Sequence, residues 1–155
     1  MKSEGDYQFL LNASFRFLSF RPRSFKEIHD FLTKKIRKQK VYGPGLTEKV
    51  TERLRELGYV DDIKFVQWWV EQRQGRKPKG MQLIIRELLS KGVARDAIEQ
   101  VLSSEIENQE EMAKKALQQK LKTVQDKKKL MDFLLRRGFD ASSARRAVDA
   151  TVGKR

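Results

Sequence analysis

A helix-ending segment recurs in this chain and limits the possible folds more than any other feature. The segments Leu89-Ser90-Lys91-Gly92-Val93 and Leu135-Arg136-Arg137-Gly138-Phe139 are 46 residues apart, and both place a cation, a glycine and an apolar residue after a leucine. Glycine readily adopts the left-handed conformation that closes a helix, and the apolar residue after it can fold back on the last turn. Recurrence at this period indicates tandem helical units.

The stretch 59–93 predicts two amphipathic helices joined by a tight basic loop. Asp61 and Asp62 suit the start of the first helix, because carboxylates accept hydrogen bonds from free N–H groups and favour the positive end of the helix dipole. Pro78 and Gly80 then interrupt the helical pattern. Apolar residues return with helical spacing at Met81, Ile84, Ile85, Leu88 and Leu89.

The same scheme extends over the whole chain. Helices are predicted at 6–20, behind Ser24, between Thr47 and Gly58, and at 62–74, 81–91, 94–104, 107–121, 126–137 and 141–152. Ser24 and Glu27 have the spacing of a capping box. We therefore predict an all-α fold of three tandem three-helix repeats, at 1–58, 59–105 and 106–155, that form an elongated, curved molecule. A repeat of this size buries too little apolar surface to be stable alone, so neighbouring repeats must support one another.

The charge of the chain favours an acidic partner. The sequence has 34 basic and 21 acidic residues, for a net charge of +13. Residues 1–60 and 107–155 each carry 13 basic and 7 acidic residues, whereas 61–106 carry 8 and 7. Such a field attracts nucleic acid or an acidic protein surface. The sequence has no cysteine, no membrane-length apolar run and a polar start, so we expect a cytoplasmic protein without disulfides.

Residues suited to catalysis or to a cofactor are scarce. His29 is the single histidine, and the sequence holds no second imidazole or thiol to complete a nucleophile and base pair. Asp61 and Asp62 lack further oxygen ligands at a recognised metal spacing, so capping explains them. The loops at 43–45 and 75–80 contain glycine but lack the phosphate-loop pattern and the strand before it. We therefore predict a protein that is not an enzyme and has no metal or cofactor.

Basic residues at the helix corners are the candidate partner contacts. Equivalent corners of successive repeats would align along one edge of a solenoid and could meet phosphates or carboxylates there. The candidates are Arg21, Arg23, Arg73, Arg76, Lys77, Lys79, Lys127, Lys128, Arg136 and Arg137. Arginine suits this role because its guanidinium binds such groups through paired hydrogen bonds. The alternative for Arg73 is an internal partner, Asp61, Asp62 or Glu87, and for any single lysine it is solvation of a helix surface.

Ten residues of the stretch 59–93 match the pattern of a known family. They are Asp61, Asp62, Phe65, Trp69, Arg73, Pro78, Gly80, Glu87, Leu88 and Gly92. On these residues the chain resembles the RecX family, bacterial modulators of the RecA recombinase. The resemblance implies three tandem three-helix repeats that lodge as a monomer in the groove of the RecA nucleoprotein filament. It also implies inhibition of the recombinase, ATPase and co-protease activities that serve homologous recombination, DNA repair and the SOS response.

Two departures from the family pattern and one alternative function stand beside this resemblance. Ser14-Phe15 replaces an expected small residue and leucine, and the 43–45 loop is long. The alternative is a DNA-binding protein of the helix-turn-helix type, because three short helices with a basic third element are also the parts of that motif. Arg95, opposed by Glu99, is the one cation of the helix predicted at 94–104. This favours weak, non-specific contact with single- or double-stranded DNA over recognition of a preferred duplex sequence.

Overall fold

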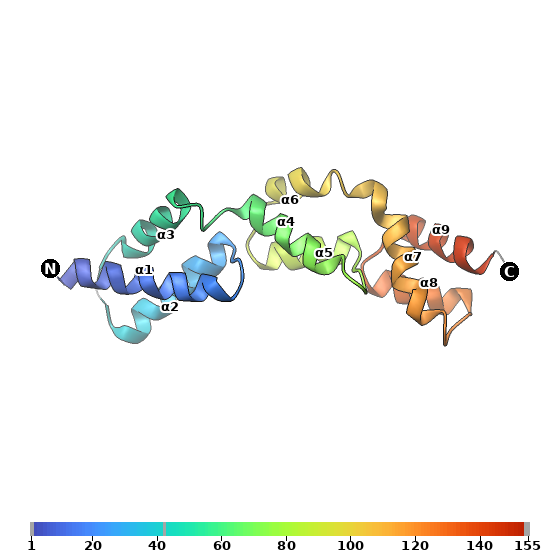
Figure 1. The fold of residues 1–155 in the computed structure, drawn as a ribbon, viewed down its shortest axis with the longest axis horizontal. Helices are drawn as coiled ribbons and strands as arrows, with labels where there is room; N and C mark the ends of the chain where they lie inside the picture. The colour runs from blue at the N-terminus through green and yellow to red at the C-terminus, as the bar shows by residue number, and fades with distance from the viewer. Residues whose placement is uncertain (1, 42, 154–155) are drawn as a thin grey trace. The chain divides into compact units, whose positions relative to one another are not determined.

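The secondary structure of the described residues is entirely helical, which confirms the all-α prediction (Figure 1). The computed structural model describes residues 2–41 and 43–153 and contains no strand in these ranges. In order, the elements are α1 (Lys2–Phe20), α2 (Phe25–Gln39), α3 (Leu46–Glu56), α4 (Asp62–Arg73), α5 (Met81–Ser90), α6 (Arg95–Leu102), the 3-10 helix η1 (Ile106–Asn108), α7 (Gln109–Lys120), α8 (Lys127–Arg136) and α9 (Ala141–Val152).

The chain divides into two compact units. Unit 1 comprises the chain up to Phe65 together with Lys91–Val93, and unit 2 comprises Val66–Ser90 and the chain from Ala94. The boundaries of the three repeats, at 58 and 105, stay a prediction.

Helices α1, α2 and α3 enclose the core of unit 1. Its buried residues are Leu10, Leu11, Ile28, Leu32, Leu46, Val50, Leu54 and Val60. Most of them recur three or four positions apart, so each helix turns one apolar face inward. Ser14 is fully buried on α1, and its Oγ donates to the Leu10 carbonyl at 2.8 Å. Ser14 therefore lies in this core without an unpaired hydroxyl group.

The start of α2 is as predicted, whereas the predicted start of α3 is wrong. At α2, the Glu27 N–H donates to Ser24 Oγ at 3.1 Å, and the Ser24 N–H donates to Glu27 Oε1 at 3.2 Å, which completes the capping box. At α3, Gly45 and not Thr47 occupies the N-cap position, with φ of +79°. Glycine tolerates this left-handed conformation, so the 43–45 turn delivers the chain into the helix earlier than a threonine cap would.

Two other helices differ from the prediction by more than a residue or two at an end. Helix α1 begins at Lys2 instead of residue 6, with Gly5 inside it. The helix predicted at 107–121 is divided into η1 and α7. Gln109, at the start of α7, is buried, and its Oε1 accepts a hydrogen bond from the Met81 N–H at 2.9 Å. η1 therefore ends and α7 begins where the Gln109 side chain accepts a hydrogen bond from a backbone group that is distant in the sequence.

Lys91–Val93, the segment after α5, packs against the start of α2 within unit 1. Ser24 Oγ donates to the Lys91 carbonyl at 2.7 Å, and Val93 is buried. Gly92 has φ of +78°, as predicted for a helix end, and a side chain there would collide with Lys26. The Ser24 hydroxyl thus accepts the hydrogen bond that caps α2 and donates the hydrogen bond that holds Lys91–Val93.

Helices α7, α8 and α9 pack around the second core, which lies in unit 2 (Figure 1). Its buried residues are Ala113, Ala116, Leu117, Leu130, Leu134, Phe139, Ala144, Ala147 and Val148. The alanines of α7 and α9 are small, so the two helices can approach closely. Asp126 and Asp140 cap α8 and α9 through hydrogen bonds from backbone N–H groups of the first turn.

The loops before α5 and before α9 are joined backbone to backbone in unit 2. The Gly80 N–H donates to the Arg137 carbonyl at 2.8 Å, and the Gln82 N–H donates to the Gly138 carbonyl at 3.1 Å. A Cβ atom at Gly80 would lie only 2.1 Å from the Gly138 carbonyl carbon. Gly138 itself has φ of +96°. Glycine is therefore required on both sides of this junction.

Candidate functional site

The four cations around the α4–α5 loop were all predicted as partner contacts, but the structure separates them into two pairs. Arg73 and Lys79 are partly buried and bind Glu87 of α5. Arg76 and Lys77 are exposed and line a pocket with residues of α7 and α8. Only the second pair is available to a partner without breaking an internal ion pair.

The Glu87 carboxylate accepts hydrogen bonds from three side chains, two of the family pattern and one of the α4–α5 loop. The donors are Trp69 Nε1 at 2.7 Å, Arg73 Nε at 2.8 Å and Lys79 Nζ at 2.9 Å. Burial acts to raise the pKa of Glu87, but the hydrogen bonds from these three donors outweigh it and hold the pKa below its ordinary value. The internal alternative for Arg73 is therefore the observed one, with Glu87 as its partner.

Arg137 fastens the α4–α5 loop to the end of α8. Its Nη2 donates to the Lys77 carbonyl at 2.5 Å and its Nε donates to the Pro78 carbonyl at 3.1 Å. The Lys79 N–H donates to the Arg73 carbonyl at 2.9 Å, which closes the same loop. Since carbonyl groups carry no net charge, the positive charge of Arg137 is not cancelled.

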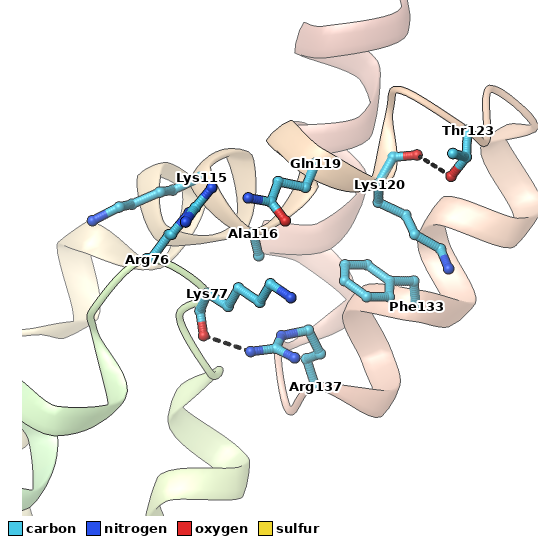
Figure 2. A pocket seen from close by; sticks show the side chains of 9 residues that line it. All are labelled: Arg76, Lys77, Lys115, Ala116, Gln119, Lys120, Thr123, Phe133 and Arg137. Atoms are coloured by element: carbon cyan, nitrogen blue, oxygen red, sulfur yellow. Dashed lines mark hydrogen bonds between the residues drawn. The ribbon is translucent and has the colours of Figure 1, made fainter.

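The pocket lies among the α4–α5 loop, α7 and α8 and has a volume of about 290 Å³. Figure 2 shows its lining: Arg76, Lys77, Lys115, Ala116, Gln119, Lys120, Thr123, Phe133 and Arg137. Five of these nine residues are cations, and none is a carboxylate. Lys120 Nζ lies 5.3 Å from the centre of the Phe133 ring, and Arg137 Cζ lies 5.8 Å from it. The pocket therefore concentrates positive charge beside an apolar wall.

Six of the nine residues that line this pocket were not among the predicted contacts. Lys115, Gln119 and Lys120 come from α7, which was read only for its apolar stripe. A signal was present, because Lys115 and Gln119 are four residues apart and so share a helix face. Nothing local, however, indicates that this face meets the α4–α5 loop.

The other predicted contacts do not lie at the pocket. In unit 1, Arg21 forms an ion pair with Glu27 at 2.5 Å, and Arg23 lies over the Phe17 ring at 3.8 Å and donates to the Phe17 carbonyl.

The remaining predicted contacts lie on or beside α8 in unit 2. Lys127, Lys128 and Arg136 are exposed, and Lys127 Nζ is 3.6 Å from Asp149 Oδ1. These three cations are accessible to a partner, but they are not among the residues that line the pocket.

The remaining residues of the family pattern are structural in this chain. Asp61 caps α4 as predicted, since its Oδ1 accepts from the Ile63 and Lys64 N–H groups. Asp62 instead accepts from the Phe25 N–H at 2.9 Å, so it serves the start of α2. The role of Asp62 could not be predicted from neighbouring residues, because Asp62 and Phe25 are far apart in the sequence. Phe65 and Leu88 are buried.

Clusters of potential metal ligands were sought among the described side chains. In residues 2–41 and 43–153, no three His, Asp or Glu side chains gather at a spacing suited to a metal ion. His29 Nε2 lies 4.0 Å from Glu48 Oε1.

Within those ranges, none of the helices combines the length and the apolar character that a bilayer crossing requires.

Comparison with solved structures supports the fold. The crystal structure of RecX from Lactobacillus salivarius matches with a TM-score of 0.75 and 19% identity, and covers 98% of this chain and 99% of that one. A second crystal structure, of regulatory protein RecX, matches with a TM-score of 0.72 and 21% identity over 99% of this chain and 74% of that one.

Sequence relatives and family models agree with each other. Regulatory protein RecX of Listeria innocua is 30% identical over 91% of this chain, which spans only 54% of that relative, about half its length. Regulatory protein RecX of Chlorobium phaeobacteroides is 33% identical over 89% of this chain and 90% of its own length. The models of the second and third three-helix domains of RecX match residues 61–102 and 105–148. The resemblance seen in the sequence is thereby confirmed, and the chain belongs to the RecX family of regulatory proteins.

Proposed function

We propose that this chain binds the RecA nucleoprotein filament and inhibits its recombinase, ATPase and co-protease activities without catalysing a reaction itself. The observation that carries the proposal is the family match over residues 61–102 and 105–148, with relatives named regulatory protein RecX. Its proposed place of action is the bacterial cytoplasm, in DNA repair, homologous recombination and the SOS response. It acts as a monomer.

The basic pocket of unit 2 is the proposed contact surface. An acidic filament surface or the DNA backbone is attracted to a cluster of cations that no internal carboxylate neutralises. Arg76 and Lys77 form no ion pair within residues 2–41 and 43–153, whereas Arg73 and Lys79 both pair with Glu87. Three of the ten predicted contacts, Arg76, Lys77 and Arg137, line the pocket, and Lys115 and Lys120 line it with them.

Titration of single-stranded-DNA-dependent ATP hydrolysis and strand exchange by RecA tests the proposal. We expect inhibition at amounts well below one chain per RecA protomer. The variant Arg76→Glu/Lys77→Glu/Lys115→Glu should need at least about tenfold more protein, since loss of one charge-assisted hydrogen bond costs about 1.5 kcal/mol or more. Arg73 and Lys79 are left unchanged, because reversing them would remove both ion pairs of Glu87 and set like charges beside it.

A matched control carries the same change of charge elsewhere. Lys34, Arg37 and Lys38 are exposed on α2 in unit 1. Reversing these three residues to glutamate should leave inhibition within about twofold of wild type. Equal loss in both triple variants would remove the pocket as the contact surface. A chain that inhibits neither activity at any ratio would remove the proposed function.

Direct binding of a duplex sequence, as in helix-turn-helix proteins, remains the second candidate. The third helix of unit 1 does not favour it, because Arg53 and Arg55 of α3 pair with Glu56 and Glu52 of the same helix. A helix that reads base edges needs such side chains free. Salt-resistant preference for one duplex sequence would support this candidate against the filament proposal.

A further inference from the structure

We infer that the pocket among the α4–α5 loop, α7 and α8 binds two neighbouring phosphate groups, with Arg76, Lys77, Lys115 and Lys120 as the contacts. This inference concerns the pocket alone and can be tested without a recombinase. It stands on the way the cations are held, on the size of the space and on the chemistry of its lining.

Three of the five cations of the pocket, Arg76, Lys120 and Arg137, are oriented by neutral groups. The Gln119 amide faces Arg76, and with its oxygen and nitrogen exchanged, the orientation its neighbours favour, its oxygen accepts from Arg76 Nη2 at 2.9 Å and from Nε at 3.1 Å. Arg137 is held by two backbone carbonyls, and Lys120 by the Phe133 ring. Neutral partners fix these side chains without cancelling their charge, which preorganises the site for an anion.

Other clusters in the same unit show the opposite arrangement. Lys114, one residue from Lys115, pairs with Glu110 at 3.4 Å and Glu111 at 3.2 Å. Among the ion pairs formed within residues 2–41 and 43–153, none includes Arg76, Lys77 or Lys115. The pocket therefore keeps a charge that nearby carboxylates neutralise elsewhere.

The size and charge of the pocket favour phosphates over a single carboxylate. Its volume of about 290 Å³ corresponds to roughly ten waters at about 30 Å³ each, which is room for two adjacent phosphate groups. One carboxylate would balance only one of the five lining cations. Adjacent phosphates bring several negative charges close together, and a guanidinium binds each through paired hydrogen bonds. The apolar ring of Phe133 strengthens these interactions by excluding water on one side.

Two sources can supply this chemistry, a nucleic-acid strand or a free oligophosphate. Calorimetry with sodium pyrophosphate and tripolyphosphate measures the second, and fluorescence anisotropy of a labelled oligothymidylate measures the first. The variant Arg76→Gln/Lys115→Gln should weaken binding of the phosphate probe at least about tenfold. Control Lys34→Gln/Lys38→Gln, on exposed α2 positions, should stay within about twofold.

Salt dependence and chemical shifts sharpen the test. If a nucleic-acid strand is the source, the logarithm of its binding constant decreases with the logarithm of the salt concentration. This negative slope should be shallower by about 1.4 in the pocket variant, since each of the two lost contacts contributes about 0.7. In the unmutated chain, pyrophosphate should shift the amide resonances of Arg76, Lys115 and Lys120, a result that does not depend on how a variant folds. Binding of either probe with these changes supports the inference. It is overturned if neither probe binds, or if the pocket and control variants lose affinity equally.

Discussion

Gly80→Ala should be among the most destabilising single-methyl changes in unit 2. The added Cβ would lie 2.1 Å from the Gly138 carbonyl carbon, 2.2 Å from the Phe139 nitrogen and 2.3 Å from the Gly138 oxygen. All three are backbone atoms, so no side chain can turn aside to make room. Overpacking of this kind costs about 1–3 kcal/mol. Separation of the two loops would also weaken the Gly80 and Gln82 hydrogen bonds, worth about 1 kcal/mol each.

A total of about 3 kcal/mol should lower the midpoint of thermal unfolding by roughly 6–12 °C. Circular dichroism at 222 nm measures this shift, and amide hydrogen exchange at Gly80 and Gln82 measures the loosened junction directly. Gly75→Ala is the matched control, because Gly75 lies in the same loop and a Cβ atom added to it would meet nothing within 4 Å. If the two variants unfold within about 0.5 kcal/mol of each other, close approach of the two backbones does not limit stability and the reasoning is wrong.

Two further substitutions test the internal hydrogen bonds. Glu87→Gln should cost about 2 kcal/mol at pH 7, since bonds to a charged group are worth about 1.5–3 kcal/mol. The pKa of Glu87 in the folded protein is below its ordinary 4.5, so its carboxylate stabilises the fold above that pH. In urea titrations, the difference in unfolding free energy between wild type and Glu87→Gln should therefore shrink as the pH falls through the lowered pKa. A difference that is constant with pH would contradict this. Ser24→Ala should cost about 2 kcal/mol in the same assay, because it removes both a helix cap and the hydrogen bond from Ser24 Oγ to the Lys91 carbonyl. The control Ser19→Ala, at an exposed position, should cost less than about 0.5 kcal/mol, and equal costs for the two serines would refute the assigned role of Ser24.

The candidate site could be predicted only in part. Arg76, Lys77 and Arg137 were predicted as contacts from their places at helix corners, and all three line the pocket. The same rule also selected Arg73 and Lys79, which bind Glu87 instead. Position at a corner does not reveal whether a carboxylate from the next helix will reach the cation. That depends on how α4 and α5 pack, which is not a property of either helix alone.

Local features of the fold were predicted well where a single helical turn decides them. The capping box of Ser24 and Glu27 and the cap at Asp61 involve residues within three positions of each other. The cap predicted for α3 was wrong because the N-cap residue is Gly45 in a left-handed conformation, and glycine has no capping side chain that would mark the position. The prediction that Asp62 caps α4 was wrong because its backbone partner, Phe25, lies 37 residues away.

The sequence by itself determined the helical class, because apolar periodicity, glycine stops and caps act over three or four residues and need no tertiary information. It also determined the excess of positive charge. Tertiary structure alone decided which cations remain available. Arg137 binds a loop 60 residues earlier in the chain, and Gly80 meets Gly138 backbone to backbone. Contacts between such distant residues depend on the packing of whole helices. That packing pairs Arg73 and Lys79 with Glu87 and gathers five cations beside Phe133 in a lining that contains no carboxylate.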